Sequence, residues 1–391
     1  MNSTPSSSAR NMRRPPSAAT GSISSRRSSR GWQPARWAMT DDINRLLANR
    51  VSFLADAGPD EDIAISSRIR LARNLAGHRF PVAADSGELH KICDEVSGAA
   101  AESGALGCPE CFSFDPEKMD GLDRELLLER RLASRDFLNR PTGTRLLVKD
   151  DESRSVMINE EDHLRIQTML PGFQLGAVWA QIDELDNKLA ARLDYAFDDR
   201  LGFLTCCPTN VGTGMRASVM LHLPGLVLTG QIAPTIQGIN KLNLAVRGIG
   251  GEGTGNQGNL FQVSNQSTLG ESEAQILERL NTVIGQLIAH EKNARQLLLQ
   301  RDQFSLLDHV GRSYGTLRHS YKLSGEEAVN CLSGVRVGVD LGMFSALDIH
   351  TVNELFIGIG AAHLQKAAGR VLNAAERDVC RAALCREKLK L

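Results

Sequence analysis

The segment Asn159–Arg165 (NEEDHLR) concentrates side chains that could carry out acid–base and anion-binding chemistry. It places three consecutive carboxylates, a histidine and an arginine within a short stretch of chain. The apolar residues 156–158 come directly before it, which predicts a buried strand that ends at a polar site. A solvated acidic loop is the alternative that this segment leaves open.

Two further segments carry arginines in patterns that suit phosphate binding. The run from Ser66 to Arg70 (SSRIR) alternates cations along an extended stretch, and the segment from Cys207 to Arg216 (CPTNVGTGMR) joins a thiol, a glycine turn and another arginine. The sequence contains neither a GxxxxGK[ST] loop nor the protein-kinase motifs. Guanidinium groups, which stay charged and offer planar paired donors, could hold phosphate instead.

The composition is that of a soluble globular protein long enough for two domains. The chain has 391 residues, of which 42% are hydrophobic and 23% charged. No apolar run reaches the roughly 18 to 20 residues that a membrane-spanning helix needs, so a membrane protein is not expected. Residues 1–40 contain seven arginines and no acidic residue, which leaves 38 basic and 46 acidic side chains elsewhere. Nucleic acid is therefore not expected as a partner.

Residues 1–39 are rich in serine and arginine and poor in aliphatic side chains. Such a segment cannot bury enough apolar surface to fold, so we predict a disordered leader. An organelle transit peptide is an alternative, and Met39 could also be the true start. A disordered or misassigned leader is favoured over a targeting signal.

The eight cysteines do not form a spacing typical of a disulfide framework. Cys108 and Cys111 form a lone CxxC pair, which could supply two of the four ligands of a structural zinc. No second pair at metal spacing is present. Free thiols in a reducing cytoplasm are favoured over zinc binding or redox activity.

Hydrophobic periodicity predicts an α+β fold with an antiparallel-dominated sheet flanked by helices, followed by an all-helical region. The predicted helices are 41–57, 88–103, 122–137, 184–194, 271–302 and 374–390. The predicted strands include the run with the paired arginines, 156–158, 225–232 and 243–246. The expected domains are 1–39 as leader, 40–298 as catalytic domain and 299–391 as helical C-terminal domain.

Taken together, the three motifs resemble those of the ATP:guanidino phosphotransferases, the family of creatine and arginine kinases. Their order is most similar to the bacterial protein arginine kinase branch, the McsB type, from about Gly58 to the C-terminus. The resemblance implies ATP and Mg²⁺ as cofactors, with Mg²⁺ resting largely on the nucleotide phosphates, so no protein metal ligand is expected. It also implies that the helical domain serves dimerisation and phosphoarginine recognition.

The resemblance places five arginines around the nucleotide phosphates. This sequence departs from creatine and arginine kinases at two positions. Met220 stands where those enzymes carry a histidine near the adenine, and Arg131 stands where a histidine contacting the nucleotide is expected. The full set of implied nucleotide-binding residues is Ser66, Ser67, Arg68, Ile69, Arg70, Arg131, Arg165, Arg216, Ala217, Ser218, Val219, Met220, Arg247, Gly248, Ile249, Gly250 and Gly251.

A guanidinium acceptor has a pKa above about 12, so it must lose a proton as the N–P bond forms. The resemblance assigns Glu161 as the catalytic carboxylate. It assigns Glu252 as the second carboxylate of arginine-using members, which creatine kinases usually lack. Cys207 matches the reactive cysteine of the family and would position the acceptor, with Cys206 as a candidate inert thiol.

Near the C-terminus, Arg377, Asp378 and Arg381 fit the RDxxRA pattern that the resemblance associates with phosphoarginine recognition and allosteric control. A helix with ordinary salt bridges is the alternative. Only a short ordered segment, 40–65, precedes Ser66, whereas small-molecule guanidino kinases carry about a hundred residues there. The resemblance thus implies a cytoplasmic protein arginine kinase with protein substrates, homodimerisation, and links to an activator subunit, a Clp-type protease and stress response. A free-arginine kinase and a non-catalytic phosphoarginine-binding adaptor are the alternatives.

Overall fold

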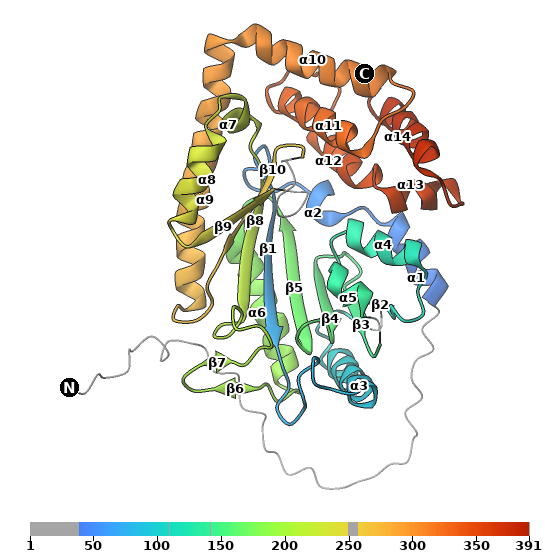
Figure 1. Cartoon of the computed structure of the whole chain (residues 1–391), viewed down its shortest axis with the longest axis vertical. Coiled ribbons are helices and arrows are strands. Elements are labelled where there is room, and N and C mark those ends of the chain that lie inside the picture. Colours follow the sequence, from blue (N-terminus) through green and yellow to red (C-terminus); the bar gives the residue numbers. More distant parts are fainter. Residues whose placement is uncertain (1–38, 109, 141, 249–256, 391) are drawn as a thin grey trace, which may run out of the picture.

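The computed structural model describes residues 39–108, 110–140, 142–248 and 257–390. The predicted leader up to residue 38 lies outside this part of the chain. An eight-stranded sheet runs through the centre of the molecule and a group of helices lies beyond one end of it (Figure 1). The protein therefore has the α+β architecture expected from the sequence.

The strands of the large sheet pair antiparallel throughout, in the order β2-β3-β4-β5-β1-β8-β10-β9. A separate pair, β6 and β7, forms a small ribbon. The strands are β1 (Ala64–Arg73), β2 (Phe112–Phe114), β3 (Arg145–Val148), β4 (Arg154–Ile158), β5 (Leu164–Pro171), β6 (Phe197–Asp198), β7 (Gly202–Phe203), β8 (Met215–His222), β9 (Leu244–Gly248) and β10 (Leu260–Asn265).

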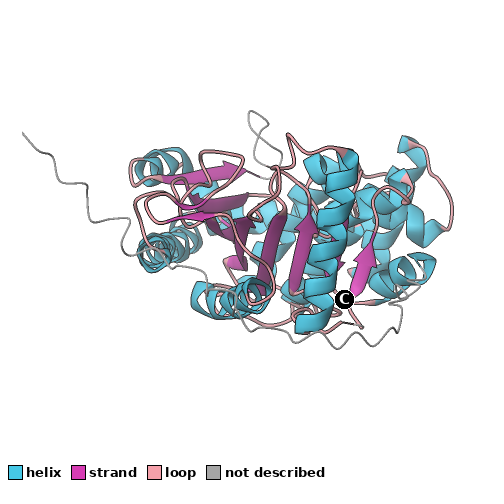
Figure 2. Cartoon of the chain, turned by 90° about the horizontal axis from the view of Figure 1, so that it is seen from below, coloured by secondary structure: helices cyan, strands magenta, loops and turns pink. Residues whose placement is uncertain are grey.

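Helices flank the sheet and build the C-terminal region (Figure 2). Those before the C-terminal region are α1 (Met39–Ala48), α2 (Ser52–Ala55), α3 (Ser86–Ser103), α4 (Gly121–Glu129), α5 (Arg135–Asn139), α6 (Leu175–Ala190), α7 (Pro224–Leu228), α8 (Ile232–Asn240) and α9 (Glu273–Arg301). The C-terminal helices are α10 (Gln303–His319), α11 (Gly325–Asp340), α12 (Ile349–Gly358), α13 (Ala361–Ala368) and α14 (Ala374–Lys388).

The central strands have one apolar face and one polar face. Ile69 on β1 pairs with Thr168 and Ala217, and all three side chains are fully buried. Helices α6 and α9 pack against the central strands, with Ile182 and Leu280 among their buried side chains. Because side chains alternate along a strand, covering one face with helices leaves the other available for polar residues.

A buried polar network joins the C-terminal helices to the sheet domain. Arg336 of α11 has no solvent exposure and donates to the backbone oxygen of Asp62 at 2.8 Å and to Asn353 Oδ1 at 2.9 Å. Its guanidinium also lies 3.0 Å from Nδ1 of His222, at the end of β8. Arg336 thereby ties α11, α12 and the sheet together in one place.

The predicted strand 225–232 is wrong, because this stretch contains α7 and the start of α8. Pro224 occupies the first turn of α7, where its missing N–H costs nothing. The buried carboxylate of Glu291 on α9 accepts the backbone N–H groups of Gly225 at 2.8 Å and Leu226 at 2.9 Å. A distant side chain thus supplies the helix cap, which the local β-type composition could not reveal.

Three predicted helices have different limits in the structure. The helix 41–57 is divided into α1 and α2, and the helix 122–137 into α4 and α5. The helix 184–194 begins earlier, at Leu175. Ser134 caps α5 by accepting from the backbone N–H of Phe137 at 3.1 Å, which separates it from α4.

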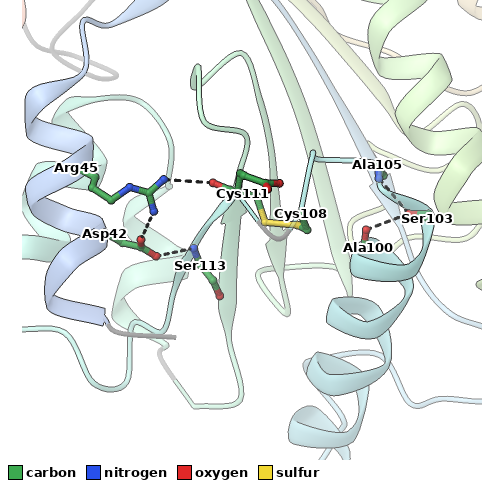
Figure 3. Close-up of a disulfide and its surroundings, with 9 residues drawn as sticks. Asp42, Arg45, Ala100, Ser103, Ala105, Cys108, Cys111 and Ser113 are labelled. Atoms are coloured by element: carbon green, nitrogen blue, oxygen red, sulfur yellow. Dashed lines mark hydrogen bonds and ion pairs between the residues drawn. A yellow bond between two sulfur atoms is a disulfide. The ribbon is translucent and has the colours of Figure 1, made fainter. Parts of the chain in front are cut away.

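Cys108 and Cys111 form a disulfide, so the prediction of free thiols is wrong for this pair (Figure 3). The turn before β2 brings their Cα atoms to 4.7 Å, within the range that a disulfide bridges. Asp42 of α1 accepts from the backbone N–H of Ser113 and from Arg45 beside this turn. The remaining six cysteines are free thiols.

Candidate active site

The two arginines of the SSRIR run and the arginine that follows Cys207 lie on one face of the sheet. Arg68 and Arg70 are two residues apart on β1, so their side chains leave the strand on the same side. Arg70 lies directly opposite Arg216 of β8 in the antiparallel register. Residues opposite one another in a sheet share a face, so these three guanidinium groups gather on one side.

The remaining two predicted phosphate-binding arginines lie on the same face. Arg165 of β5 is opposite Ala72, the next residue on that side of β1. Arg247 of β9 is opposite Gln262 of β10, which is itself opposite Met220 of β8. We refer to the five residues as the arginine cluster: Arg68, Arg70, Arg165, Arg216 and Arg247.

The arginine cluster holds more positive charge than its surroundings neutralise. Burial, followed by the charges of Arg131, Arg165 and Arg216, lowers the pKa of Arg68 to about 9. Burial and neighbouring arginines also lower the pKa of Arg70 well below its usual range, and its buried Nε has no hydrogen-bond partner within the described residues. A bound polyanion would relieve both the repulsion and the unmet donor.

Arg131 joins this cluster from the loop after α4 with an uncommon backbone conformation. Its φ is 60°, in the left-handed region that side chains other than glycine rarely adopt. The backbone oxygen of Arg131 accepts from Gln167 of β5 at 3.1 Å, which holds the loop against the sheet. The side chain borders the same cavity as Arg68 and Ser218.

The NEEDHLR segment is a loop between β4 and β5 that distant residues hold in place. Asn159 has a φ of 59° and donates through its side chain to the backbone oxygens of Leu89 and Gly143, both at 2.8 Å. His163 accepts from the backbone N–H of Leu75 through Nδ1 at 2.9 Å, while Nε2 lies 3.0 Å from the oxygen of Arg79. Burial lowers the pKa of His163 to about 4, so this histidine is neutral and structural.

Asp162 connects this loop to the segment that carries Cys206 and Cys207. Its Oδ1 accepts from Asn74 and from the backbone N–H of Cys206, each at 2.7 Å. The neighbouring Cys207 Sγ lies 3.0 Å from Thr209 Oγ1 and also contacts Glu161. Burial and Asp162 raise the pKa of Cys206 to about 12, which agrees with an inert thiol at that position.

The pKa values of the two glutamates of the loop, Glu160 and Glu161, are shifted in opposite directions. Burial would raise the pKa of Glu160, but its ion pair with Arg165 and a hydrogen bond from Ser134 hold that pKa below its ordinary value. Burial and the charge of Asp162 raise the pKa of Glu161. Glu161 is therefore the better proton acceptor of the two, since its ionised form is the less stabilised.

Several residues of the predicted nucleotide-binding runs face the apolar side of the sheet. Ile69, Ala217 and Val219 are fully buried in the core. The Ser67 hydroxyl donates to the backbone oxygen of Gly172 at 2.8 Å. These residues shape the strands, and only their alternate neighbours face the arginine cluster.

Gly248 ends β9, whereas Ile249, Gly250, Gly251 and Glu252 lie outside the described residues.

Sequence reasoning missed the residues that position this site. Gln262 accepts from Arg68 at 3.1 Å, and Asn74 donates to Asp162 while accepting from the backbone N–H of His163 at 2.9 Å. Only the pairing of strands distant in sequence gives these amides their partners, so no local pattern could have identified them.

The RDxxRA residues lie on α14 in unequal environments. Arg381 is 5% exposed and donates to the backbone oxygens of Leu323 at 2.7 Å and Ile359 at 3.1 Å. It also pairs with Asp378 at 2.7 Å. Arg377 is half-buried and donates to the oxygen of Leu372.

Comparison with known proteins agrees with this arrangement. Residues 102–294 match the model of the ATP:guanido phosphotransferase C-terminal catalytic domain, and residues 303–391 match the protein-arginine kinase McsB C-terminal domain. The taurocyamine kinase of Schistosoma mansoni, solved with transition state analogue components, is 27% identical with a TM-score of 0.53. That match covers 63% of this chain and 35% of the other. The fold and the site thus define an ATP:guanidino phosphotransferase.

Closer relatives narrow this class. A protein-arginine kinase of Halothermothrix orenii is 43% identical over 354 residues, covering 90% of this chain and all of the relative. One of Bacillus subtilis is 44% identical over 340 residues, covering 87% of this chain and 93% of the relative. The chain belongs to the family of protein-arginine kinases.

Proposed function

We propose that this protein transfers the γ-phosphoryl group of ATP to arginine side chains of other proteins. The observation that carries the proposal is the gathering of five arginines from four strands on one face of the sheet, beside Glu161 and Cys207. Phosphoryl transfer depends mainly on positioning and on electrostatic stabilisation of the γ-phosphoryl oxygens. A cluster of fixed guanidinium groups supplies both.

The arginines and the proposed base Glu161 follow one another along the sheet in the order that phosphoryl transfer needs. Arg68 lies toward the Ser66 end of β1, and Arg70 and Arg216 lie one step further along. Arg216 is close enough to Glu161 and Cys207 for their charges to act on it. The phosphates would therefore lie along β1, with the γ-phosphoryl group nearest Glu161.

In the proposed reaction a guanidinium nitrogen of the substrate attacks the γ-phosphorus. The N–P bond forms, the bond between the γ-phosphorus and the β,γ-bridging oxygen breaks, and ADP leaves. Glu161 accepts the proton that the nitrogen loses, and its raised pKa makes it the stronger base. Cys207, which contacts Glu161, would help to orient the acceptor.

Mg²⁺ would enter with the nucleotide and neutralise charge on its phosphates. Among the described residues, no group of three His, Cys, Asp or Glu side chains gathers in a way that could hold a metal ion. The arginine cluster and the orphaned Arg70 Nε suit the phosphates themselves. Mg²⁺ usually takes its ligands from substrate phosphates and water, so the arginines would bind the phosphates and the phosphates would bind Mg²⁺.

The end of the site where the acceptor guanidinium would bind is exposed. This exposure favours a protein substrate over free arginine. Thr209, beside Cys207, is exposed, and Val82 beside Cys206 is 71% exposed. Only α1 and α2 precede β1 in the described chain. A site bordered in this way leaves room for an arginine on a polypeptide.

The test is mass spectrometry of an acceptor protein such as casein after incubation with this protein and ATP·Mg²⁺, without acid treatment. We expect phosphate on arginines of the acceptor, with less transfer to free arginine. Glu161→Gln should slow transfer by roughly 10²- to 10⁴-fold, the range for loss of a general base. Transfer to free arginine alone would favour the small-molecule kinase, and an unchanged rate in Glu161→Gln would refute the assigned base.

We also propose that Arg377 and Asp378 bind phosphoarginine, with Arg381 positioning Asp378 through their ion pair. A planar guanidinium suits phosphate, and a carboxylate suits the guanidinium of the ligand. The family further suggests a cytoplasmic homodimer that acts with an activator subunit and marks substrates for a Clp-type protease under stress. None of the described helices is long and apolar enough to cross a membrane.

A further inference from the structure

A cavity of about 100 Å³ lies where the C-terminal helices meet the sheet domain. This volume is several times the roughly 10 to 15 Å³ that one water molecule occupies by the same measure. The sheet domain and α2 contribute most of its lining, and α11 and α12 contribute the rest. The lining residues are Phe53, Leu54, Ile65, Ser66, Glu129, Arg131, Met220, Leu260, Val329, Phe356 and Ile357.

The cavity continues the arginine cluster. Ser66, Arg131 and Met220 line it and also line the neighbouring cavity that contains Arg68. Along β1 the surroundings therefore change from apolar near Ser66 to cationic at Arg68 and beyond. An adenine nucleotide has the same sequence of properties, with an apolar planar base at one end and phosphates at the other.

We propose that the C-terminal domain forms part of the nucleotide site, with Val329 of α11 and Phe356 and Ile357 of α12 contacting the base. The inference rests on the proposed function, which assigns the phosphates to the arginine cluster. Apolar and aromatic side chains with a few polar groups are the usual lining of small-molecule sites. Phe356 would add a ring contact to the base, since aromatic surfaces pack well against planar rings.

Direct hydrogen bonds hold α13, which follows α12 in the chain, against this side of the sheet domain. The carboxylate of Glu129, at the end of α4, accepts from the backbone N–H groups of Ala362 at 2.8 Å and His363 at 3.1 Å. It also pairs with His363 Nδ1 at 2.7 Å. A Cβ on Gly360 would come within 2.4 Å of the Glu129 carboxylate, so a larger residue there would displace this carboxylate from its partners.

A second connection lies beside Val329. The backbone N–H of Gly258 donates to Asn330 Oδ1 at 2.8 Å, and Asn259 donates to Ser333 Oγ at 2.9 Å. The Cγ1 atom of Val329 lies within 2.6 Å of the position that a Cβ on Gly258 would occupy. Helix α11 is thus in close contact with the chain that enters β10, and its side of the cavity is fixed.

The test compares the binding of ADP·Mg²⁺ and of tripolyphosphate·Mg²⁺ by titration calorimetry on the full chain. Tripolyphosphate carries the phosphates without a base. In Phe356→Ala we expect the Kd for ADP to rise about tenfold or more, as loss of an aromatic contact predicts. The Kd for tripolyphosphate should stay within about twofold of wild type.

A second variant and a control separate the base contact from general loosening of the domain. Val329→Phe would fill the cavity and should weaken ADP binding in the same selective way. Phe344→Leu, which alters a partly buried ring of the same domain away from the cavity, should leave both affinities unchanged. The thermal unfolding of each variant shows that it is folded.

Unchanged ADP binding in both cavity variants would overturn the inference. Equal weakening of ADP and tripolyphosphate, or the same loss in Phe344→Leu, would also overturn it, because the domain would then act only through overall stability. A wild-type protein that binds neither ligand would instead refute the phosphate site and with it the proposed function.

Discussion

At the scale of single residues, the adjacent carboxylates Glu160 and Glu161 differ because different side chains surround them. Glu160 is 7% exposed and is committed to Arg165 and Ser134, so it fixes the arginine cluster. Glu161 has no ion pair within the described residues and lies against Cys207. Environment, and not residue type, separates the structural carboxylate from the proposed base.

The raised pKa of Glu161 predicts how the reaction rate declines at acidic pH. Glu161 must be ionised to accept a proton, and burial with the charge of Asp162 raises its pKa above the usual value of 4.5. As the pH falls through that raised pKa, kcat should decline, and the decline should begin at a higher pH than for an exposed glutamate. Initial rates of protein phosphorylation across the acidic and neutral range would measure it.

Glu161→Gln provides the comparison, because its residual activity should lack this acid limb. Circular dichroism at each pH would show that the fold is retained. A limb of the same shape in the variant would assign the titration to another group.

At the scale of elements, α11 carries the main connection between the two domains. Arg336 meets Asp62, Asn353 and His222, and Arg295 of α9 pairs with Asp340 at 3.1 Å. Burial lowers the pKa of His222 well below its usual range, so its neutral ring can accept from Arg336. A buried network of this kind is costly to break because each orphaned partner stays desolvated.

Arg336 also pairs with the buried Asp340 at 3.4 Å. Arg336→Met should therefore reduce the free energy of unfolding by about 3 to 5 kcal/mol, the range for removing one partner of a buried ion pair. Denaturant titration would measure this change. Arg312→Met on α10 is the matched control, since Arg312 is 80% exposed and pairs with Asp308 on the surface. Its effect should be within about 0.5 kcal/mol. Equal effects of the two substitutions would show that the connection contributes little.

Helix α14 carries both the proposed phosphoarginine-binding residue Arg377 and the structural residue Arg381. Arg377 is half-buried with one backbone contact, whereas Arg381 is buried with two backbone oxygens and Asp378. Arg377→Ala should raise the Kd for free phosphoarginine about tenfold or more without lowering the unfolding temperature. Calorimetric titration measures the affinity.

Arg370→Ala is the control, because Arg370 is exposed and forms a surface ion pair with Glu376. Unaltered phosphoarginine binding in Arg377→Ala would contradict the assignment of this residue. Comparable loss in both variants would point to a nonspecific charge effect.

At the scale of the whole molecule, the described domains share contacts at several places. Besides the network of Arg336, Arg50 of the sheet domain pairs with Glu354 of α12 at 2.7 Å, and Glu129 caps α13. A single residue, Asp302, separates α9 from α10, so the linker between the two domains is short. Elements coupled in this way unfold together.

We therefore expect a single cooperative transition in differential scanning calorimetry. Saturation with ADP·Mg²⁺ should move the whole transition upward, by a free energy of about 2.7 kcal/mol at a ligand concentration one hundred times the Kd. Two separate transitions, or a shift of only part of the heat absorption, would show that the domains are energetically independent. Sodium chloride at the same ionic strength is the control for nonspecific salt effects.

The sequence by itself determined the fold class, the long helix α9 and the residues of the arginine cluster. Alternation along SSRIR was enough to place two guanidinium groups on one side of a strand, because strand geometry is local. Hydrophobic periodicity likewise predicted α9 and α14, because spacing along a helix is local. The resemblance then supplied the proposed chemistry of those residues.

Only the tertiary structure decided what depends on segments far apart in the chain. Helix α7 forms where a strand was predicted because Glu291, more than sixty residues away, caps it. Arg381 of α14 donates to the backbone oxygens of Leu323 and Ile359. Val329 and Phe356 reach the cavity beside Met220 through domain packing. These contacts arise from non-local burial and hydrogen bonding, which local spacing does not encode.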